Sequence, residues 1–442
     1  MTIAAKDISK KLNKYIFSSM LAMIGVSCYF LVDTFFISVA SGANGITSLN
    51  LCLPMYAVMC ALGSMIGIGA ATNYNLDRSM GKEDYQLHFS NAILWVAFFS
   101  SIFLFMGIAI PEKVLLLMGA DDVILHAGLP YMRTMLCFGP AFMMNLTVTP
   151  FVRNDNAPSI AMAATLCSSF FNIIFDYILM FPLGLGLFGA ALASGISPLV
   201  SIAVCMIHFF SKKNTLRFLW KFPSIRRLLR ACSLGVAGFV GEISSGVITM
   251  CFNLVLLRIA GNIGVAAYGI IANISLVGIS LFNGISQGLQ PMASEAGGLG
   301  RTEEHKFICR HSLVIGIIFS AVFVAILWGF TAPIVNIFNS EGSAALSDYA
   351  TVGLRLYSLG FLLAVVNIVR SGYFGAIGRA KECSVISLLR GIVAIVVFVI
   401  ILPLFLDIYG VWLAFPVSEL FTFFVSVIYA HIPQKSDIKI SE

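Results

Sequence analysis

Residues 157–210 read APSIAMAATLCSSFFNIIFDYILMFPLGLGLFGAALASGISPLVSIAVCMIHFF, and Asp176 is the only Asp, Glu, Lys or Arg among them. Apolar runs over 157–181 and 188–210 lie on either side of a turn that contains Pro and Gly. A helix of about 20 apolar residues crosses a hydrocarbon core about 30 Å thick. Lipid leaves helices or a closed barrel as the options for a spanning chain, and uninterrupted runs of this length favour helices. The segment therefore predicts two consecutive membrane-spanning helices.

The same pattern recurs along the whole chain. Of its 442 residues, 59% are apolar and 11% are charged, against about 25% charged in an ordinary soluble domain, and the mean hydropathy is +0.95. No polar stretch is long enough for a separate domain, which excludes an attached soluble catalytic or nucleotide-binding module. The predicted fold class is an all-α integral membrane protein with twelve transmembrane helices, near 13–39, 46–72, 88–110, 128–150, 157–181, 188–210, 232–257, 264–292, 308–332, 350–372, 383–404 and 410–431.

Lysine and arginine are concentrated on one side of this predicted topology. All but four of the 27 lie in the two terminal segments and in or near the even-numbered loops, above all in the loop at 211–231. Short cytoplasmic loops collect basic residues. We therefore expect both termini and this loop to face the cytoplasm, in a multi-pass protein of the cell membrane.

The two halves of the chain repeat each other. Gly42-x-x-Gly45 after the first predicted span recurs as Gly261-x-x-Gly264 after the seventh, 219 residues later. Further matches at offsets of 219 and 221 link other corresponding spans. Because each half has an even number of spans, both halves insert the same way, and repeats of this kind place a binding site near the midplane between them. The predicted units are an N-terminal six-helix lobe at 1–210, a basic cytoplasmic linker at 211–231 and a C-terminal six-helix lobe at 232–442.

Acidic side chains occur within the predicted spans of the first half. An ionisable residue in a span costs about 2.5–3.5 kcal/mol on insertion scales, so it marks either function or a paired structural role. Asn172 and Asp176 are four residues apart and share a helix face, while Asp33 lies one turn from Tyr29. The alternative is that Asn172 and a neutral Asp176 form a hydrogen-bonded clamp between helices, and Asp33 has a similar structural alternative.

Small residues on the sixth predicted span complete a set of oxygen donors. Ala190 and Ser194 lie one turn apart and offer a main-chain carbonyl and a hydroxyl. Carboxylate, amide, hydroxyl and carbonyl oxygens suit Na⁺, or a proton shared by two carboxyl groups, rather than a soft metal. The predicted cation-coupling residues are Asp33, Asn172, Asp176, Ala190 and Ser194, with Asp33, Asn172, Asp176 and Ser194 as side-chain ligands for Na⁺.

Polar residues of the second half form stripes at helical spacing. Glu242 begins one stripe in the seventh span, and a second stripe follows the eighth span. Such stripes would line a wet cavity, although packing of small polar residues between helices is the alternative interpretation. Glu419 has the same two interpretations. The predicted substrate cavity is lined by Tyr29, Glu242, Thr249, Asn253, Asn283, Gln287 and Gln290.

Missing motifs exclude several classes of protein. The chain has no GxxxxGK[ST] sequence, no TVGYG-like filter and no HExxH, and no nucleophile and base have the spacing of an intramembrane enzyme. A secondary transporter is the class that remains. We therefore expect no enzymatic activity, no cofactor beyond a coupling ion, Na⁺ or H⁺, and no nucleic-acid partner.

The chain resembles the multidrug and toxic compound extrusion (MATE) family, most of all its prokaryotic DinF-like and MepA-like branch. The similarity covers essentially the whole chain and rests on the two six-helix halves and on four motifs, Tyr29-x-x-x-Asp33, Asn172-x-x-x-Asp176, Gly189-Ala190-Ala191-Leu192-Ala193-Ser194 and Gln287-x-x-Gln290-Pro291. It implies an antiporter that expels small amphipathic, often cationic compounds in exchange for Na⁺ or H⁺. It also implies a monomer in the bilayer whose two lobes rock between outward and inward openings. By position, Asp33, Asn172, Asp176, Ala190 and Ser194 would form the cation site of the first lobe.

Two features depart from the family pattern. Ser194 stands where many members have Thr, which keeps the hydroxyl. The acidic cluster that NorM-like members carry in the second lobe is not reproduced, so Glu242 is assigned to substrate instead. The competing function is a lipid-linked oligosaccharide flippase or polysaccharide exporter of the same superfamily. Such a protein would line its cavity with several Arg and Lys to hold pyrophosphate, whereas the spans here carry acids and few bases.

Overall fold

The computed structural model describes residues 3–120, 122–338 and 343–432, and within these ranges the regular secondary structure is entirely helical. Helix α1 (Ile3–Ser79) contains two spans, Lys6–Ile37 and Ser48–Ser79. Pro111 and Pro158 occupy first positions of helices, where the missing N–H of proline would have no helical partner anyway. The other helices of the first half are α2 (Leu87–Ala109), α3 (Pro111–Leu117), α4 (Asp122–Cys137), α5 (Gly139–Asn154), α6 (Pro158–Met180) and α7 (Gly186–Phe209).

The second half begins with another long helix, α8 (Ile225–Gly298). A straight helix of its 74 residues would measure about 110 Å, far more than the thickness of one bilayer. It is broken at Gly261, whose φ of 60° and ψ of −154° lie outside the helical region. The remaining elements are α9 (Thr302–Gly329), α10 (Thr331–Phe338), α11 (Ala344–Ser358), α12 (Phe361–Ala376), α13 (Ala380–Leu388), the π-helix η1 (Leu389–Val393), α14 (Ala394–Ile401) and α15 (Pro403–His431).

These helices make up twelve membrane crossings. Among the described residues, nine helices are long and apolar enough to cross a membrane, and the bent pairs α4–α5 and α11–α12 bring the number to eleven. The break at Gly261 divides α8 into two crossings, which gives twelve. The predicted all-α membrane fold is therefore confirmed, with shifts of a few residues at the ends of the spans.

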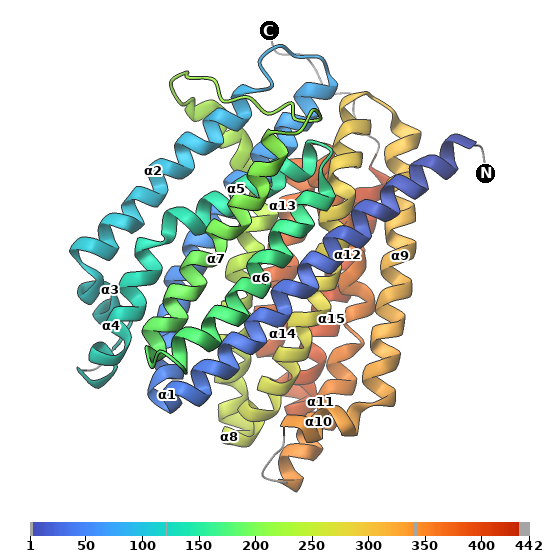
Figure 1. Ribbon diagram of the computed structural model, residues 1–442. Coiled ribbons are helices and arrows are strands. Elements are labelled where there is room, and N and C mark those ends of the chain that lie inside the picture. The colour runs from blue at the N-terminus through green and yellow to red at the C-terminus, as the bar shows by residue number, and fades with distance from the viewer. Residues whose placement is uncertain (1–2, 121, 339–342, 433–442) are drawn as a thin grey trace.

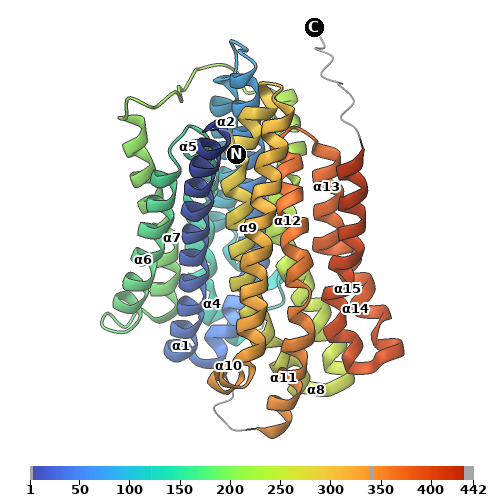
Figure 2. The ribbon, with the colours of Figure 1, turned by 90° about the vertical axis from the view of Figure 1, so that its right-hand side faces the viewer.

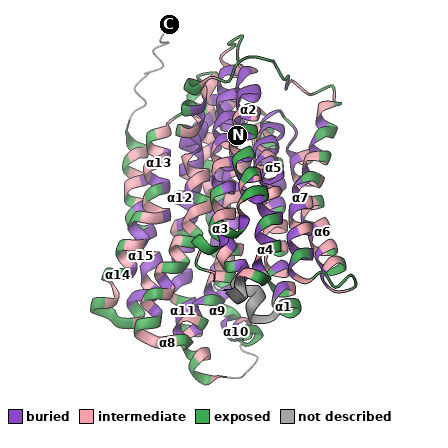
Figure 3. Ribbon diagram, turned by 90° about the vertical axis from the view of Figure 1, so that its left-hand side faces the viewer, coloured by how far each residue is buried: buried purple, intermediate pink, exposed green. Residues whose placement is uncertain are grey.

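The two halves of the chain form two bundles side by side (Figure 1). The start of α1, the end of α15 and the loop between α7 and α8 lie at one end of the molecule in both views (Figures 1 and 2). Exposed residues lie mainly on the outward faces of the helices, and buried residues lie between the helices (Figure 3). Large apolar side chains are among the exposed ones, and in a membrane they contact lipid; examples are Phe35, Phe105, Phe170 and Phe424.

Each bundle is held together by its own hydrophobic core. One core is formed by buried residues of the segment 37–231, and the other is formed mainly by buried residues of the segment 252–415. The second core also includes the start of α1, through Leu12, Tyr15, Ile16 and Met20. The first span therefore begins against the second bundle and continues into the first.

Close backbone contacts join the bundles near the end that carries the termini. A Cβ atom at Gly235 would overlap the carbonyl oxygen of Met65, so the seventh span touches the backbone of the second. Gly288 approaches the backbone of Ile16 in a similar way, which joins the eighth span to the first. Only glycine allows an approach this close, since any side chain would push the two helices apart.

Asn75 adds hydrogen bonds across the same interface. Its Nδ2 donates to the carbonyl oxygen of Pro291 at 2.8 Å and to Oγ of Ser294 at 2.7 Å. Positions 75 and 294 are 219 residues apart, which is the offset of the sequence repeat. The pair therefore joins two equivalent segments. Backbone contact and side-chain hydrogen bonds together close the interface at this end.

Candidate functional site

Asp33 and Asp176 come together in the first bundle. Asp33 lies in the first span of α1 and Asp176 lies near the end of α6, and their side chains are buried. The two carboxyl groups face each other closely enough for one to donate to the other when it is protonated. No other donor in the described part of the chain reaches Oδ1 of Asp33 or either oxygen of Asp176. Two adjacent carboxylates repel each other unless a proton or a cation lies between them.

Asn172 and Ser194 lie beside this pair. Asn172 is one turn before Asp176 on α6, and its Nδ2 donates to Oγ of Ser194 on α7 at 3.1 Å. The side-chain oxygen of Asn172 has no donor among the described residues. Ala190 is fully buried one turn before Ser194. Its carbonyl oxygen accepts the helical hydrogen bond from residue 194, so it can offer only its second lone pair to an ion.

Three residues of this site leave buried oxygens without a donor. Buried polar atoms that lack a partner are rare in folded proteins. Carboxylate and amide oxygens are hard donors, which suit a hard cation such as Na⁺, and a proton shared by the carboxyl groups would also remove their repulsion. No described group of three or more His, Cys, Asp and Glu could hold a metal ion. The unpartnered oxygens are Oδ1 of Asp33, Oδ1 of Asn172, and Oδ1 and Oδ2 of Asp176.

Glu242 lies at the interface between the bundles. Oγ of Ser64, in the second span, donates to Oε1 of Glu242 at 3.3 Å. The carboxyl group of Glu242 also interacts electrostatically with Tyr29 and Tyr56 of the first bundle. The structure thus places Tyr29 and Glu242 near each other, although they are far apart in the sequence. A carboxylate and aromatic rings in the same region form an environment that attracts organic cations.

The other residues predicted for the substrate cavity have different surroundings. Nε2 of Gln287 reaches across the interface and lies 3.6 Å from Sδ of Met23 in the first span. Thr249 is exposed, and its hydroxyl group interacts with Tyr268 of its own bundle. Glu242 and Gln287 are thus the second-half residues of this set with a described side-chain contact to the first bundle. Thr249 is the one exposed member of the set, and the half-buried members are Tyr29, Glu242, Asn253, Asn283, Gln287 and Gln290.

The second bundle contains a buried ion pair that the sequence analysis did not identify. Oε1 of Glu419 accepts a hydrogen bond from Nε of Arg390 at 3.1 Å, and Oε2 accepts one from Nδ2 of Asn367 at 2.7 Å. The Glu419 side chain is 1% exposed. Arg390, counted above with the bases near the loops, lies instead on η1 within the eleventh span. The sequence did contain a sign of this role, because Arg390 lies inside the predicted span at 383–404.

The equivalent place in the first bundle has no charge. At the repeat offset of 221, Arg390 and Glu419 correspond to Ser169 and Pro198 of the first bundle. The second bundle therefore supplies its own cation, Arg390, to its buried carboxylate. Among the described residues, the buried carboxyl groups with an unpartnered oxygen both belong to the first bundle, at Asp33 and Asp176.

Known proteins with similar sequences and folds support one family. The MatE family model matches residues 18–178 and 239–400. The chain is 27% identical over 382 residues to the multidrug export protein MepA of Staphylococcus saprophyticus subsp. saprophyticus, covering 85% of this chain and 83% of that protein. It is 26% identical over 392 residues to MepA of Staphylococcus aureus strain MRSA252, with the same coverage.

Two solved structures have the same fold. One is a MOP superfamily transporter from Pyrococcus furiosus, with a TM-score of 0.87 and 20% identity, covering 96% of this chain and 95% of that chain. The other is a MATE protein in complex with MaL6, with a TM-score of 0.88 and 19% identity, covering 97% of this chain and 98% of that chain. Because the family model matches more than half of the residues, the chain belongs to the MatE family, as its motifs predicted.

Proposed function

We propose that the protein is a secondary active multidrug exporter, which moves small amphipathic, often cationic compounds out of the cell in exchange for Na⁺ or H⁺. The observation that carries this proposal is the pair of buried carboxyl groups at Asp33 and Asp176, of which Oδ1 of Asp33 and both oxygens of Asp176 lack donors among the described residues. Such a pair binds a cation or a proton at one stage of a transport cycle and releases it at another. Similarity to proteins named multidrug export protein MepA supports the substrate class.

Na⁺ is the favoured coupling ion in this proposal. The side-chain oxygen of Asn172 and the hydroxyl group of Ser194 add little to a proton site, but they extend the coordination shell of a metal ion. A proton shared by Asp33 and Asp176 would compete for the same place. Either ion carries one positive charge and gains about 2.3 kcal/mol per 100 mV of membrane potential. The potential alone therefore does not distinguish them.

Glu242 is the proposed recognition point for cationic substrates. Its carboxyl group lies at the interface and interacts electrostatically with Tyr29 and Tyr56 of the other bundle. The attraction between opposite charges strengthens as the local dielectric constant falls, and aromatic faces add cation–π attraction. A neutral substrate would gain only the contact with the rings.

The proposed transport cycle is alternating access, and the two separate hydrophobic cores support it. The end that carries the basic loop at 211–231 faces the cytoplasm in this proposal, and the contacts between Gly235 and Met65 close it. These contacts, and the hydrogen bond from Asn75 to Ser294, must separate when the substrate site opens toward the cytoplasm. The protein acts as a monomer in the cell membrane.

Dye efflux from proteoliposomes tests the coupling. The full-length protein is reconstituted at equal pH on both sides with the membrane potential clamped, and efflux of a cationic dye is measured with and without an opposing Na⁺ gradient. We expect Na⁺ to stimulate the wild type and the control Asp348→Asn, which changes an exposed acid. Asp33→Asn and Asp176→Asn should abolish the stimulation while expression stays near the wild-type level.

The same experiment separates the alternatives. No response to Na⁺, alongside a clear response to an imposed pH gradient, would replace Na⁺ by H⁺ as the coupling ion. Normal coupled efflux by Asp176→Asn would instead favour the structural clamp between Asn172 and Asp176, because a clamp tolerates an amide.

A further inference from the structure

We propose that the protein has a second ligand site, which binds an anionic phosphate group at the end that carries the termini. The site is an open cavity of about 450 Å³. It is formed by the start of α1, the turn between α5 and α6 and the loop that follows α7. It is separate from the carboxylate site and does not depend on the proposed transport function. Its lining residues are Lys11, Lys14, Tyr15, Asn156, Pro158 and Lys213.

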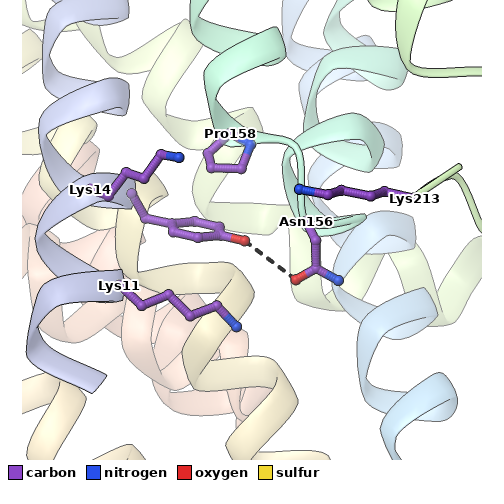
Figure 4. A pocket seen from close by; sticks show the side chains of 6 residues that line it. Lys11, Lys14, Asn156, Pro158 and Lys213 are labelled. Atoms are coloured by element: carbon purple, nitrogen blue, oxygen red, sulfur yellow. Dashed lines mark hydrogen bonds between the residues drawn. The ribbon is translucent and has the colours of Figure 1, made fainter. Parts of the chain in front are cut away.

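Three lysine side chains converge on this cavity. Lys11 and Lys14 approach from one side and Lys213 approaches from the other (Figure 4). Between them lies the hydrogen bond that the Tyr15 hydroxyl donates to Oδ1 of Asn156 at 3.4 Å (Figure 4). Lys11 and Lys14 are three residues apart, so they share a face of α1. Three ammonium groups repel one another, and their convergence therefore favours an anion between them.

Little negative charge opposes these lysines. Oε2 of Glu295, on α8, lies 3.7 Å from Nζ of Lys11. Within the described ranges, no carboxylate forms an ion pair with Lys14 or Lys213. One acid against three bases leaves an excess of positive charge at the cavity. Because the Lys11 and Glu295 side chains are almost half exposed, solvent also weakens the one pair that does form.

Asp155 does not neutralise the cavity, although it precedes Asn156 in the chain. Its side chain is buried, forms an ion pair with Arg78 at 2.7 Å and is hydrogen-bonded to Nε2 of His208 at 2.8 Å. Burial opposes ionisation, but hydrogen bonds from His208 and Thr215 and the charge of Arg78 hold the pKa of Asp155 below its usual range. The carboxylate is thus ionised, and its charge is already compensated inside the protein.

A phosphate group is the anion that fits this arrangement. Lysine binds phosphate as a point charge, and several lysines can surround one group. The N-terminus of α6, whose first residue Pro158 lines the cavity, contributes the positive end of its helix dipole. The cavity lies at an end of the transmembrane bundle, where both phospholipid headgroups and soluble phosphates are within reach. Both sources present the same group to the lysines.

Binding to the full-length, delipidated protein in neutral detergent tests the proposal. Phosphatidylglycerol, phosphatidylcholine and inorganic phosphate are titrated separately, and bound lipid is counted by native mass spectrometry. The test variant is Lys11→Gln/Lys14→Gln/Lys213→Gln. The control Lys212→Gln/Lys306→Gln/Lys381→Gln removes the same charge from exposed lysines outside the cavity. Lys11→Arg/Lys14→Arg/Lys213→Arg keeps the charge and should keep binding.

Each lysine near an anionic surface contributes about fivefold to affinity. The loss of three lysines should therefore weaken the binding of phosphatidylglycerol to the test variant about a hundredfold. The affinity of the control variant should stay within about threefold of the wild type. If inorganic phosphate does not displace the lipid, the site takes a lipid headgroup. Displacement by inorganic phosphate, with the same loss in the test variant, assigns it to a soluble phosphate. Two results would overturn the proposal. One is an equal loss of binding in the test and control variants. The other is a wild type that binds neither phosphatidylglycerol nor inorganic phosphate in preference to phosphatidylcholine.

Discussion

Replacing Asn75 by alanine should open the end of the protein that carries the termini. The Asn75 side chain donates two hydrogen bonds across the interface, at 2.8 Å to the Pro291 carbonyl oxygen and at 2.7 Å to Oγ of Ser294. A hydrogen bond contributes about 1 kcal/mol net, so Asn75→Ala should cost the closed arrangement about 2 kcal/mol. This free energy corresponds to about a 30-fold shift in the ratio of closed to open protein.

A third hydrogen bond of Asn75 does not enter this difference. Nη2 of Arg78 donates to Oδ1 of Asn75 at 2.9 Å, within one span, so it is present whether the bundles are together or apart. Its loss lowers the stability of both arrangements equally. The shift therefore measures the contacts across the interface alone.

Spin labels on the two bundles measure the opening. Glu83, between α1 and α2, and Glu303, in the first turn of α9, are exposed and lie at corresponding places in the two halves. Pulsed dipolar spectroscopy of the reconstituted protein gives the distance distribution between labels at these positions, and Asn75→Ala should raise its long-distance fraction. The control Ser233→Ala removes a hydrogen bond within α8 that does not cross the interface, and should leave the distribution unchanged. An unchanged distribution in Asn75→Ala would refute the role of these hydrogen bonds in closure.

Three further predictions follow from the site, the ion pair and the topology. Glu242→Gln should slow the efflux of cationic dyes more than that of neutral substrates, because it removes a negative charge from the interface; equal losses would leave Glu242 with a packing or gating role. Arg390→Met leaves the buried Glu419 carboxylate uncompensated and should destabilise the protein by about 3–5 kcal/mol, measured as a lower midpoint of thermal unfolding. Arg390→Met/Glu419→Gln should recover most of that loss, and a double variant no more stable than the single one would contradict the argument. Cysteines introduced at Lys212 and Leu183, which are exposed residues in successive loops, should be labelled from the cytoplasmic and the external side respectively, and labelling of both from one side would overturn the topology.

The membrane crossings could be predicted from the sequence because lipid imposes a local rule. A chain inside the hydrocarbon core must satisfy its backbone within each segment, so each crossing is a continuous apolar helix. The prediction of a span near 157–181 therefore agrees closely with α6 at Pro158–Met180. The break between the seventh and eighth spans was also visible, because Gly261 lies between the two apolar runs and takes the backbone conformation that ends the first of them.

Part of the candidate site could be predicted from the sequence for a similar reason. Asn172 and Asp176 lie on one helix face whatever the rest of the fold, since their spacing matches the helical repeat. The cost of a charge in lipid marked Asp33 and Asp176 as candidates. Their proximity could not be derived in the same way, because it depends on how the first span packs against α6.

Only the tertiary structure decided which side chains meet between helices. The contacts of Ser64 with Glu242 and of Arg390 with Glu419 depend on how each helix is rotated and shifted against its neighbour. In a soluble protein an apolar stripe would indicate that rotation, but spans that are apolar on all sides carry little such signal. The lysine cavity shows the same limit, since it joins residues of three separate elements. The sequence by itself determined the crossings and the charges that they carry, and the packing of the helices decided which charges are paired and which are left to bind an ion.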